Sequence, residues 1–333
     1  MKITVVGGGS WGLGLSKVLS DNGHEVLVYD HNPKTVQKIN DLHISPHLNE
    51  YIPEDIRATL DIKEAMKHSG VILFVVPTKV LRKAIESALP HIKDKKLFIN
   101  AAKGIEPKTF LRISQIFEEM VPPEYSRGFV TLSGPSHAEE VIRGGVTAVT
   151  SASVNEDDAF FVQKIFHNSE YFRVYSSTDL KGVELGGSLK NIFALASGIM
   201  RGFGLGDNAL AAFMTRALVE MAKIYRHLGA DTETLYGLSG IGDLIVTCTS
   251  EHSRNFRAGY QIGIGKDLNE TLDSMTMVVE GIRTAEAAYY LAEEAKLDTP
   301  IINAIYDVVF NRNDPKKALK DLLARELKAE NIG

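Results

Sequence analysis

Short runs of β-branched and other apolar residues alternate with stretches of helical periodicity along the first half of the chain. Several of these runs are apolar throughout, which is typical of strands that are buried on both faces of a parallel sheet. We predict strands at Ile3–Val6, Val26–Tyr29, Val71–Val76, Leu97–Asn100, Phe129–Leu132 and Val146–Thr150, with Tyr171–Tyr175 as a further candidate. This alternation predicts a doubly wound sheet of the Rossmann type, covered by helices on both faces.

The second half of the chain has a different pattern. After about residue 185, apolar residues recur at helical spacing over long stretches such as Ala209–Leu228, which Gly229 would end as a C-cap. Asp314 before Pro315 predicts the start of a terminal helix that runs through Lys316–Leu327. We expect this half to be all-helical.

The predicted fold class is therefore α/β, with a Rossmann-type N-terminal domain followed by an all-α C-terminal domain. We place the boundary near Lys181–Gly187, so that residues 1–185 form the sheet domain and residues 186–333 form the helical domain. A cleft between two such domains is the natural place for a substrate.

Composition narrows the possible functions. The 333 residues are 44% hydrophobic and carry a net charge of -5, with acids and bases interspersed, which argues against a nucleic-acid surface. The longest apolar runs are far shorter than the roughly 20 residues that cross a bilayer, so no membrane insertion is expected. Cys248 is the only cysteine, which excludes an intrachain disulfide and favours the cytoplasm, and its apolar surroundings predict a buried, inert thiol. The scattered histidines do not have the spacing of metal ligands.

A glycine-rich turn follows the first predicted strand. Gly7–Gly12 reads G-x-G-x-x-G and leads into a helical stretch, which is the context in which this pattern binds a dinucleotide. Gly7 would permit the tight turn, Gly9 the approach of a pyrophosphate, and Gly12 the close packing of helix on strand. Free N–H groups at the start of the helix would hold the phosphates. The alternative is an unoccupied strand-to-helix turn.

Asp30 stands 18 residues beyond Gly12, at the end of the second predicted strand. Its carboxylate can accept hydrogen bonds from an adenosine ribose and would repel a 2′-phosphate, and the only nearby potential cation is His31, which is mostly neutral at neutral pH. We therefore expect NAD(H) to be favoured, with NADP(H) possible. A surface carboxylate that ends a strand is the plainer alternative.

Seven short motifs occur in order along most of the chain. They are Gly7-Gly-Gly-Ser-Trp-Gly, Ala102-Lys-Gly-Ile-Glu, Ser133-Gly-Pro-Ser, Leu189-Lys-Asn, Gly206-Asp-Asn, Gly242-Asp-Leu and Ser253-Arg-Asn. The set resembles NAD(P)-dependent glycerol-3-phosphate dehydrogenase of the bacterial type. The resemblance implies a homodimer that interconverts dihydroxyacetone phosphate and sn-glycerol 3-phosphate and supplies glycerol 3-phosphate for phospholipid synthesis. Two positions depart from the family: His137 replaces a commoner aromatic residue, and Tyr29-Asp30-His31 replaces a stretch with an arginine.

Reduction of a ketone by hydride needs a proton donor and positive charge near the developing alkoxide. Lys190 is the first candidate, because it lies at the start of a largely apolar helix, Ile192–Ile199, where burial and the helix N-terminus would lower a lysine pKa. Lys103 follows the fourth predicted strand, at the edge where open α/β sheets bind ligands, and could polarise or position the carbonyl. Asp243 could orient Lys190 and accept a substrate hydroxyl, or it could begin a helix. From position alone, Lys190 could equally be a solvated lysine at the domain boundary, and Lys103 before a glycine is more often part of a solvated turn.

A phosphate group needs its own anchor. Ser253, Arg254 and Asn255 supply a hydroxyl, a guanidinium and an amide at the start of a predicted helix, Phe256–Ile262, which suits a dianion. A surface arginine beside an N-cap serine is the alternative. The predicted substrate-binding residues are Lys103, Gly134, Ser136, Lys190, Asn191, Asp243, Ser253, Arg254 and Asn255.

The resemblance extends the nucleotide site beyond the glycine-rich turn. Ala138 is small enough for the nicotinamide carboxamide to approach, and Glu280 is assigned by the resemblance alone. Trp11 could close over the turn, or it could pack between helix and sheet. The predicted coenzyme-binding residues are Gly7, Gly9, Ser10, Trp11, Gly12, Asp30, His31, Lys103, Ala138, Arg254, Val279 and Glu280.

Two other functions remain open. Reductases of β-hydroxy acids or of ketopantoate also have a helical second domain and a lysine beside an asparagine, but they need no phosphate anchor. A catalytically silent NAD-binding sensor would keep the glycine-rich turn and lose the chemistry. The presence of Lys103, Lys190 and Asp243 together argues against the sensor.

Overall fold

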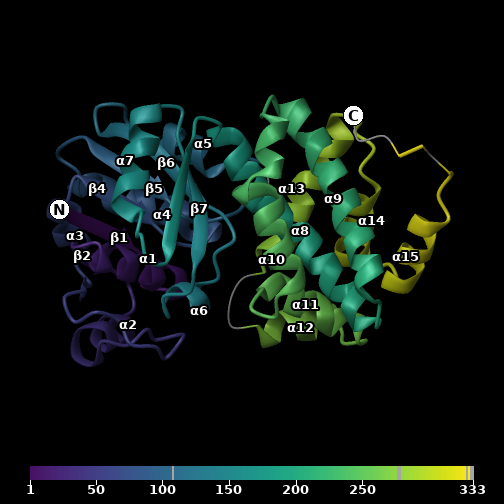
Figure 1. Cartoon of the computed structure of the whole chain (residues 1–333), viewed down its shortest axis with the longest axis horizontal. Helices are drawn as coiled ribbons and strands as arrows, with labels where there is room; N and C mark the ends of the chain where they lie inside the picture. The colour runs from purple at the N-terminus through teal and green to yellow at the C-terminus, as the bar shows by residue number, and fades with distance from the viewer. Residues whose placement is uncertain (107–108, 276–278, 328, 331–333) are drawn as a thin grey trace. The chain divides into compact units, whose positions relative to one another are not determined.

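The structure is a computed structural model that describes residues 1–106, 109–275, 279–327 and 329–330 (Figure 1). The chain forms two compact units, which we call the sheet unit and the helical unit. The sheet unit contains Met1–Lys103 and Leu111–Glu184, and the helical unit contains Gly104–Phe110 and Leu185–Gly333.

One sheet organises the sheet unit. Within the described residues it has eight strands in the order β3-β2-β1-β4-β5-β6-β7-β8. All neighbouring strands are parallel except β6 and β7, which are antiparallel. The strands are β1 Lys2–Val6, β2 Glu25–Tyr29, β3 Arg57–Thr59, β4 Val71–Phe74, β5 Lys96–Asn100, β6 Ser126–Ser133, β7 Thr147–Ala152 and β8 Phe172–Ser177.

The predicted fold class and all seven predicted strands are confirmed, with ends that shift by one to three residues. The strand predicted at Val71–Val76 ends at Phe74, for example. The sequence pattern missed β3, because this strand has three residues and only Ala58 is buried, so no periodicity can be recognised.

Helices cover both faces of the sheet. They are α1 Ser10–Asp21, α2 Pro33–Gln37, α3 Ile62–His68, α4 Thr78–Ala88, α5 Ile113–Met120, α6 Ala138–Val141 and α7 Glu156–Phe166. Side chains alternate between the faces along each strand. On β4, Val71 and Leu73 pack into a core with α1 and α7, whereas Ile72 and Phe74 pack into a second core with α4 and α5. The continuous apolar runs therefore mark strands buried on both sides, as in a doubly wound fold.

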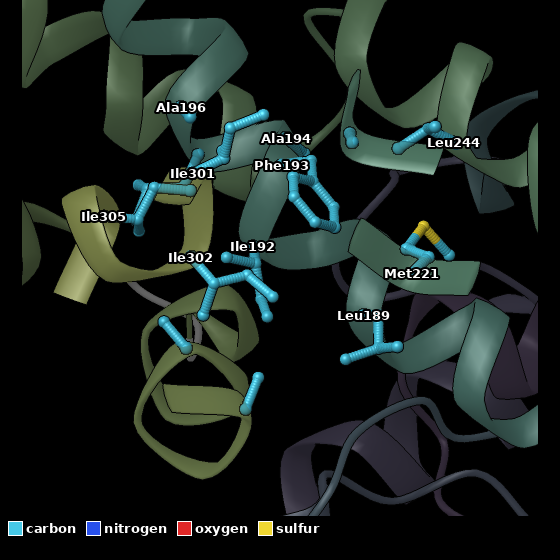
Figure 2. Packing of buried hydrophobic residues seen from close by; sticks show 14 of the residues in the cluster. Leu189, Ile192, Phe193, Ala194, Ala196, Met221, Leu244, Ile301, Ile302 and Ile305 are labelled. Carbon is cyan, nitrogen blue, oxygen red and sulfur yellow. The ribbon is translucent and has the colours of Figure 1, made fainter. Parts of the chain in front are cut away.

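The helical unit is built around α8, Leu180–Gly202, which is buried continuously from Gly182 to Met200. A helix that is buried around its whole circumference belongs in the centre of a domain. Phe193 of α8 shares one core with Met221 and Ile302 (Figure 2). The other described helices are α9 Asp207–Leu228, α10 Asp243–Thr249, α11 Arg254–Gly263, α12 Leu268–Ser274, α13 Glu280–Glu294, α14 Pro300–Phe310 and α15 Pro315–Leu323.

The all-helical second half is confirmed in these helices, and the terminal helix begins at Pro315 after its Asp314 cap. The terminal helix ends at Leu323, four residues before the predicted end at Leu327. None of its residues is buried, so no tertiary packing stabilises a further turn, although residues 324–327 are good helix formers.

Two pairs of glycines bring the backbones of α8 and α11 into contact. Gly198 and Gly202 lie on one face of α8, and Gly259 and Gly263 lie on one face of α11. A Cβ atom on Gly198 or Gly259 would lie 2.0 Å or 1.9 Å, respectively, from a backbone oxygen of the other helix. This crossing fixes the start of α11 relative to α8.

The chain passes from one unit to the other inside α8, between Glu184 and Leu185. The predicted boundary region Lys181–Gly187 is therefore a continuous helix. The short segment Gly104–Phe110 also belongs to the helical unit, where the Gly104 N–H donates to Ser188 Oγ over 3.0 Å. No local pattern in the sequence indicated that this segment belongs to the helical unit.

Candidate active site

The glycine-rich turn after β1 has the geometry that its sequence predicts. Gly7 has a φ angle of +117°, and a Cβ atom there would lie 2.8 Å from the Val75 carbonyl oxygen. A Cβ atom on Gly12 would lie 1.9 Å from the Gly7 oxygen, so only glycine allows α1 to pack this closely. A Cβ atom on Gly9, in contrast, would meet nothing within 4 Å. Protein packing therefore does not require glycine at position 9, and the open space there is compatible with the approach of a ligand to the backbone.

The first turn of α1 has features that favour binding of an anion. Gly9 is the N-cap residue and provides no side-chain cap, and the turn contains no acidic residue. Helix N-terminal N–H groups without such partners bind phosphate well. Ser10 is buried at the start of this turn, and the neighbouring Trp11 packs against the sheet core, which is the plainer of its two predicted roles.

Asp30 follows β2 and turns its carboxylate toward the glycine-rich turn. Its Oδ2 accepts from the Gly8 N–H over 2.8 Å, and its Oδ1 accepts from the Asn32 N–H over 2.9 Å. His31 Nδ1 lies 3.6 Å from Asp30 Oδ1, and the His31 side chain is 91% exposed. The carboxylate is thus held in one orientation, which a loose surface residue would not be. The sequence interpretation gave no role to Gly8, although its position inside the turn could have suggested one.

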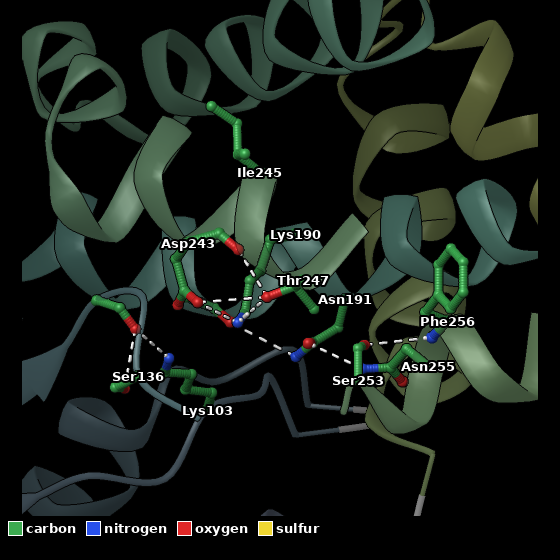
Figure 3. Close-up of polar contacts among 12 residues, drawn as sticks. Lys103, Ser136, Lys190, Asn191, Asp243, Ile245, Thr247, Ser253, Asn255 and Phe256 are labelled. Carbon is green, nitrogen blue, oxygen red and sulfur yellow. Dashed lines mark hydrogen bonds and ion pairs between the residues drawn. The ribbon is translucent and has the colours of Figure 1, made fainter. Parts of the chain in front are cut away.

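Three predicted substrate residues meet in the sheet unit, at the loop that follows β6. Lys103 Nζ donates to the Gly134 carbonyl over 2.9 Å, and Ser136 Oγ donates to the same carbonyl over 3.0 Å (Figure 3). A Cβ atom on Gly134 would lie 2.8 Å from the Val149 Cα atom, so this loop is pressed against β7. Ala138, at the start of α6, is buried.

Lys190 lies in the buried interior of the helical unit. Its Nζ forms an ion pair with Asp243 and donates to Thr247 Oγ1 over 2.6 Å (Figure 3). Asp243 is the first residue of α10, and Thr247 lies one turn later on the same face. The residue exposures are 5%, 1% and 4% for Lys190, Asp243 and Thr247, so the group is shielded from water. Low local polarity strengthens such an ion pair.

The predicted position of Lys190 at the start of a helix is wrong. Lys190 is the eleventh residue of α8, because the helix begins at Leu180 rather than near Ile192. Gly186 and Gly187 have low helix propensity, but the burial of α8 on all sides outweighs it. The helix N-terminus therefore has no influence on this lysine. Of the predicted features of its environment, the structure shows burial and the contact with Asp243. Thr247 was missed, although its spacing of four residues from Asp243 could have indicated it.

The predicted phosphate residues begin α11. Ser253 is the N-cap residue, and its Oγ accepts from the Phe256 N–H over 3.2 Å. Arg254 is the first residue of the helix and is partly exposed. The Asn255 amide is buried, and its Nδ2 donates to Asn191 Oδ1 over 2.9 Å. Capping of α11 by Ser253 is thus observed, and it is compatible with binding of an anion at the same helix end.

Val279 and Glu280 form the start of α13. Val279 occupies the N-cap position without a side-chain cap, and Glu280 is the first helical residue, where a negative charge is favoured by the helix dipole. Their predicted contact with a coenzyme stays a prediction.

Cys248 is fully buried in the helical unit, as predicted. Burial raises the pKa of its thiol to about 12. A thiol in this state is a poor nucleophile.

A glycine-rich turn on a doubly wound sheet, joined to a helical unit with a buried lysine, defines a two-domain NAD(P)-dependent dehydrogenase. Comparison with known proteins gives the family. The model of the NAD-dependent glycerol-3-phosphate dehydrogenase N-terminus matches residues 2–159, and that of the C-terminus matches residues 179–320. The chain belongs to the NAD-dependent glycerol-3-phosphate dehydrogenase family, as its seven motifs indicated, and it is an oxidoreductase.

Relatives match along nearly the whole chain. Glycerol-3-phosphate dehydrogenases with NAD(P)+ as coenzyme from Acholeplasma laidlawii and Enterococcus faecalis are 48% and 47% identical to it over 332 residues. These alignments cover 100% and 99% of this chain, and 100% and 97% of the two relatives. Full coverage means that both the sheet unit and the helical unit have counterparts in these enzymes.

Solved structures agree with this assignment. Glycerol-3-phosphate dehydrogenase from Coxiella burnetii is 34% identical and superimposes with a TM-score of 0.89, covering 97% of this chain and 99% of that one. A ketopantoate reductase from Ralstonia eutropha is 16% identical with a TM-score of 0.62, covering 96% of this chain and 100% of that one, and it shares the fold alone. The ketopantoate alternative is therefore not favoured. Across the described residues, no helix combines the length and hydrophobicity that a membrane span requires.

Proposed function

We propose that the protein interconverts dihydroxyacetone phosphate and sn-glycerol 3-phosphate, with Lys190 as the proton donor and acceptor at the substrate oxygen. The observation that supports this most is the buried group of Lys190, Asp243 and Thr247, in a chain that belongs to this dehydrogenase family throughout. The nicotinamide coenzyme supplies the hydride when it is bound. The remaining chemistry is that of the protein side chains.

The sheet unit fits a dinucleotide coenzyme. The open space beside Gly9 and the uncapped first turn of α1 suit a pyrophosphate. Asp30 has two carboxylate oxygens that each already accept one backbone N–H, and each can accept a further hydrogen bond from a ribose hydroxyl. A 2′-phosphate at this place would face the Asp30 charge, so we propose NAD(H) as the preferred coenzyme.

Lys190 is suited to proton transfer because Asp243 and Thr247 hold its Nζ atom in one orientation. Asp243 balances the positive charge, and Thr247 directs Nζ. As negative charge develops on the substrate oxygen during reduction, an ammonium group in a dry environment stabilises it and provides the proton. In the reverse direction the same amine accepts the proton.

The substrate phosphate is proposed to bind at the N-terminus of α11. Arg254 supplies a fork of donors at this helix end, and the Ser253 hydroxyl can donate while its oxygen accepts the Phe256 N–H. Lys103, with Ser136 and Gly134, is proposed to position the carbonyl end. The homodimer, the cytoplasmic location and the supply of phospholipid synthesis stay predictions.

The test is consumption of NADH by the purified protein with dihydroxyacetone phosphate, compared with unphosphorylated dihydroxyacetone and with ketopantoate. We expect turnover with dihydroxyacetone phosphate alone, and faster turnover with NADH than with NADPH. Ketopantoate as the better substrate would support the related reductases. Absence of turnover together with tight NADH binding would support the silent sensor.

Arg254→Ala sharpens this test. We expect kcat/KM for the phosphorylated ketone to fall about 10- to 100-fold, the effect of losing hydrogen bonds to a charged group. Arg257→Ala is the matched control, because Arg257 is an exposed arginine on the same helix, and it should leave kcat/KM unchanged. Equal losses in the two variants would contradict the phosphate site.

A further inference from the structure

Two buried hydrogen bonds join three helices beside the proposed phosphate site. The Asn255 amide on α11 donates from Nδ2 to Asn191 Oδ1 on α8 over 2.9 Å. Asn255 Oδ1 accepts from the backbone N–H of Gly281 on α13, also over 2.9 Å. Asn191 and Asn255 are shown in Figure 3, and both are buried. The Asn255 carboxamide thus uses both its donor and its acceptor inside the protein.

The bond to Gly281 is an N-cap that comes from another helix. Helix α13 begins at Glu280, so Gly281 is its second residue, and its N–H has no acceptor within α13. Val279, which occupies the cap position, offers no side-chain cap. Asn255 Oδ1 therefore plays the part that a serine or aspartate usually plays from the cap position itself.

The packing at this point leaves little freedom. A Cβ atom on Gly281 would lie 2.4 Å from the Asn191 backbone oxygen and 3.0 Å from Asn255 Oδ1. The first turn of α13 is thus pressed against α8, and the glycine crossing of α8 and α11 holds Asn255 in turn. A change in the Asn255 side chain must therefore alter the packing at the start of α13.

We propose that Asn255 is a positioning residue for the coenzyme: by capping α13 it holds Val279 and Glu280 where they contact the nucleotide. This inference rests on the proposed function and on the coenzyme contact of Val279 and Glu280 that the family resemblance predicts. It makes nucleotide affinity depend on a side chain next to Arg254, the proposed phosphate anchor. The proposed substrate site and one proposed coenzyme contact then depend on the same two hydrogen bonds, those of Asn255 with Asn191 and with Gly281.

The test measures the dissociation constant of NADH without substrate, by the fluorescence of the reduced nicotinamide. Asn255→Ala removes the acceptor for the Gly281 N–H, and we expect NADH to bind about tenfold more weakly, as the loss of one N-cap predicts. Asn255→Asp keeps an oxygen acceptor at the same place, so its NADH affinity should stay close to that of the unsubstituted protein. Its added negative charge should still raise KM for dihydroxyacetone phosphate. A general structural defect would not separate the two readouts in this way.

Glu220→Gln is the matched control. Glu220 on α9 also caps another helix of the same unit, because its carboxylate oxygens accept from Ile301 and Ile302 at the start of α14. Glutamine replaces one accepting oxygen with a donor, and NADH affinity should not change. Equal weakening by Glu220→Gln and Asn255→Ala would mean general loosening of the helical unit and would overturn the proposal.

The outcomes separate this inference from the proposed function. If the unsubstituted protein binds no NADH, the proposed function itself fails. If the unsubstituted protein and Asn255→Ala bind NADH equally, the function stands and the positioning role is wrong. Should Asn255→Ala not fold, Asn255→Asp decides alone, because tenfold weaker NADH binding in that variant contradicts the role of the acceptor oxygen.

Discussion

Lys190 is held by one charged partner and one neutral partner, and the two contribute differently. Asp243 compensates the charge of the ammonium group, whereas Thr247 accepts one of its N–H bonds and itself donates to the Asp243 carbonyl over 2.6 Å. The hydroxyl thus links the lysine to the backbone of α10. A side chain that orients a reacting group contributes to turnover, because the rate depends on the alignment of the reacting atoms.

Thr247→Val tests this at the residue scale. Valine keeps the volume and removes the acceptor, so we expect kcat to fall about 10- to 100-fold, because a buried hydrogen bond to a charged group is lost. NADH affinity should not change. Thr249→Val on the same helix is the control, because Thr249 is exposed and its hydroxyl donates to the Ile245 carbonyl of its own helix. Unchanged turnover in Thr247→Val would show that Asp243 alone orients the lysine.

The second prediction at the residue scale concerns Asp30 and the choice of coenzyme. Replacement by Asp30→Ala together with His31→Arg exchanges a repulsive charge for an attractive one beside a 2′-phosphate. The preference for NADH over NADPH, measured as the ratio of kcat/KM values, should fall at least about tenfold. Equal use of both coenzymes by the unsubstituted protein would mean that Asp30 does not contact the ribose.

At the scale of elements, the crossing of α8 and α11 carries the proposed site, because it sets Asn191 against Asn255. Gly259→Ala places a methyl group 1.9 Å from the Leu195 oxygen, which only a shift of the helices can relieve. We expect the variant to lose roughly 3 kcal/mol of unfolding free energy in urea. Gly206→Ala is the control, because a Cβ atom there meets nothing within 4 Å. Similar losses in both variants would refute the close crossing.

The same scale shows what the sequence could and could not predict. Strands buried on both faces produce continuous apolar runs, so seven of them were recognised from pattern alone, whereas β3 buries only Ala58. The sequence did not predict the true start of α8, because Gly186 and Gly187 have low helix propensity. Tertiary burial keeps this stretch helical. Local position could have suggested Gly8 and Thr247 as candidates, but their partners Asp30 and Lys190 lie on elements that are distant in sequence, so the contacts themselves could not be predicted.

At the scale of the whole molecule, α8 belongs to both units. Its first residues are fixed in the sheet unit, where the buried Glu184 accepts from Arg112 Nη1 and from the Ser114 N–H, each over 2.8 Å. Burial raises the pKa of this carboxyl group, while Arg112 opposes the rise. From Leu185 onward α8 forms the centre of the helical unit. One continuous helix thus connects the sheet that holds the glycine-rich turn to the residue proposed to transfer the proton.

A second buried carboxylate, Glu220, makes stability depend on pH. Burial raises the pKa of Glu220 from 4.5 to about 7, against the opposing hydrogen bonds from Ile301 and Ile302. Between these two values the folded protein binds more protons than the unfolded chain, so this group lowers the unfolding free energy as pH rises through the interval. Its contribution is constant above about pH 7 and absent well below pH 4.5.

Glu220→Gln removes this titration. The difference in unfolding free energy, variant minus unsubstituted protein, should increase by roughly 2 kcal/mol as pH rises from about 5 to about 8. The difference isolates Glu220, because every other group titrates equally in both proteins. Urea unfolding of both proteins across this range gives the difference directly. A difference that stays constant with pH would show that Glu220 keeps its ordinary pKa in the folded protein. A difference that changes with the opposite sign would show that the N–H groups of α14 stabilise the charged carboxylate more than burial destabilises it.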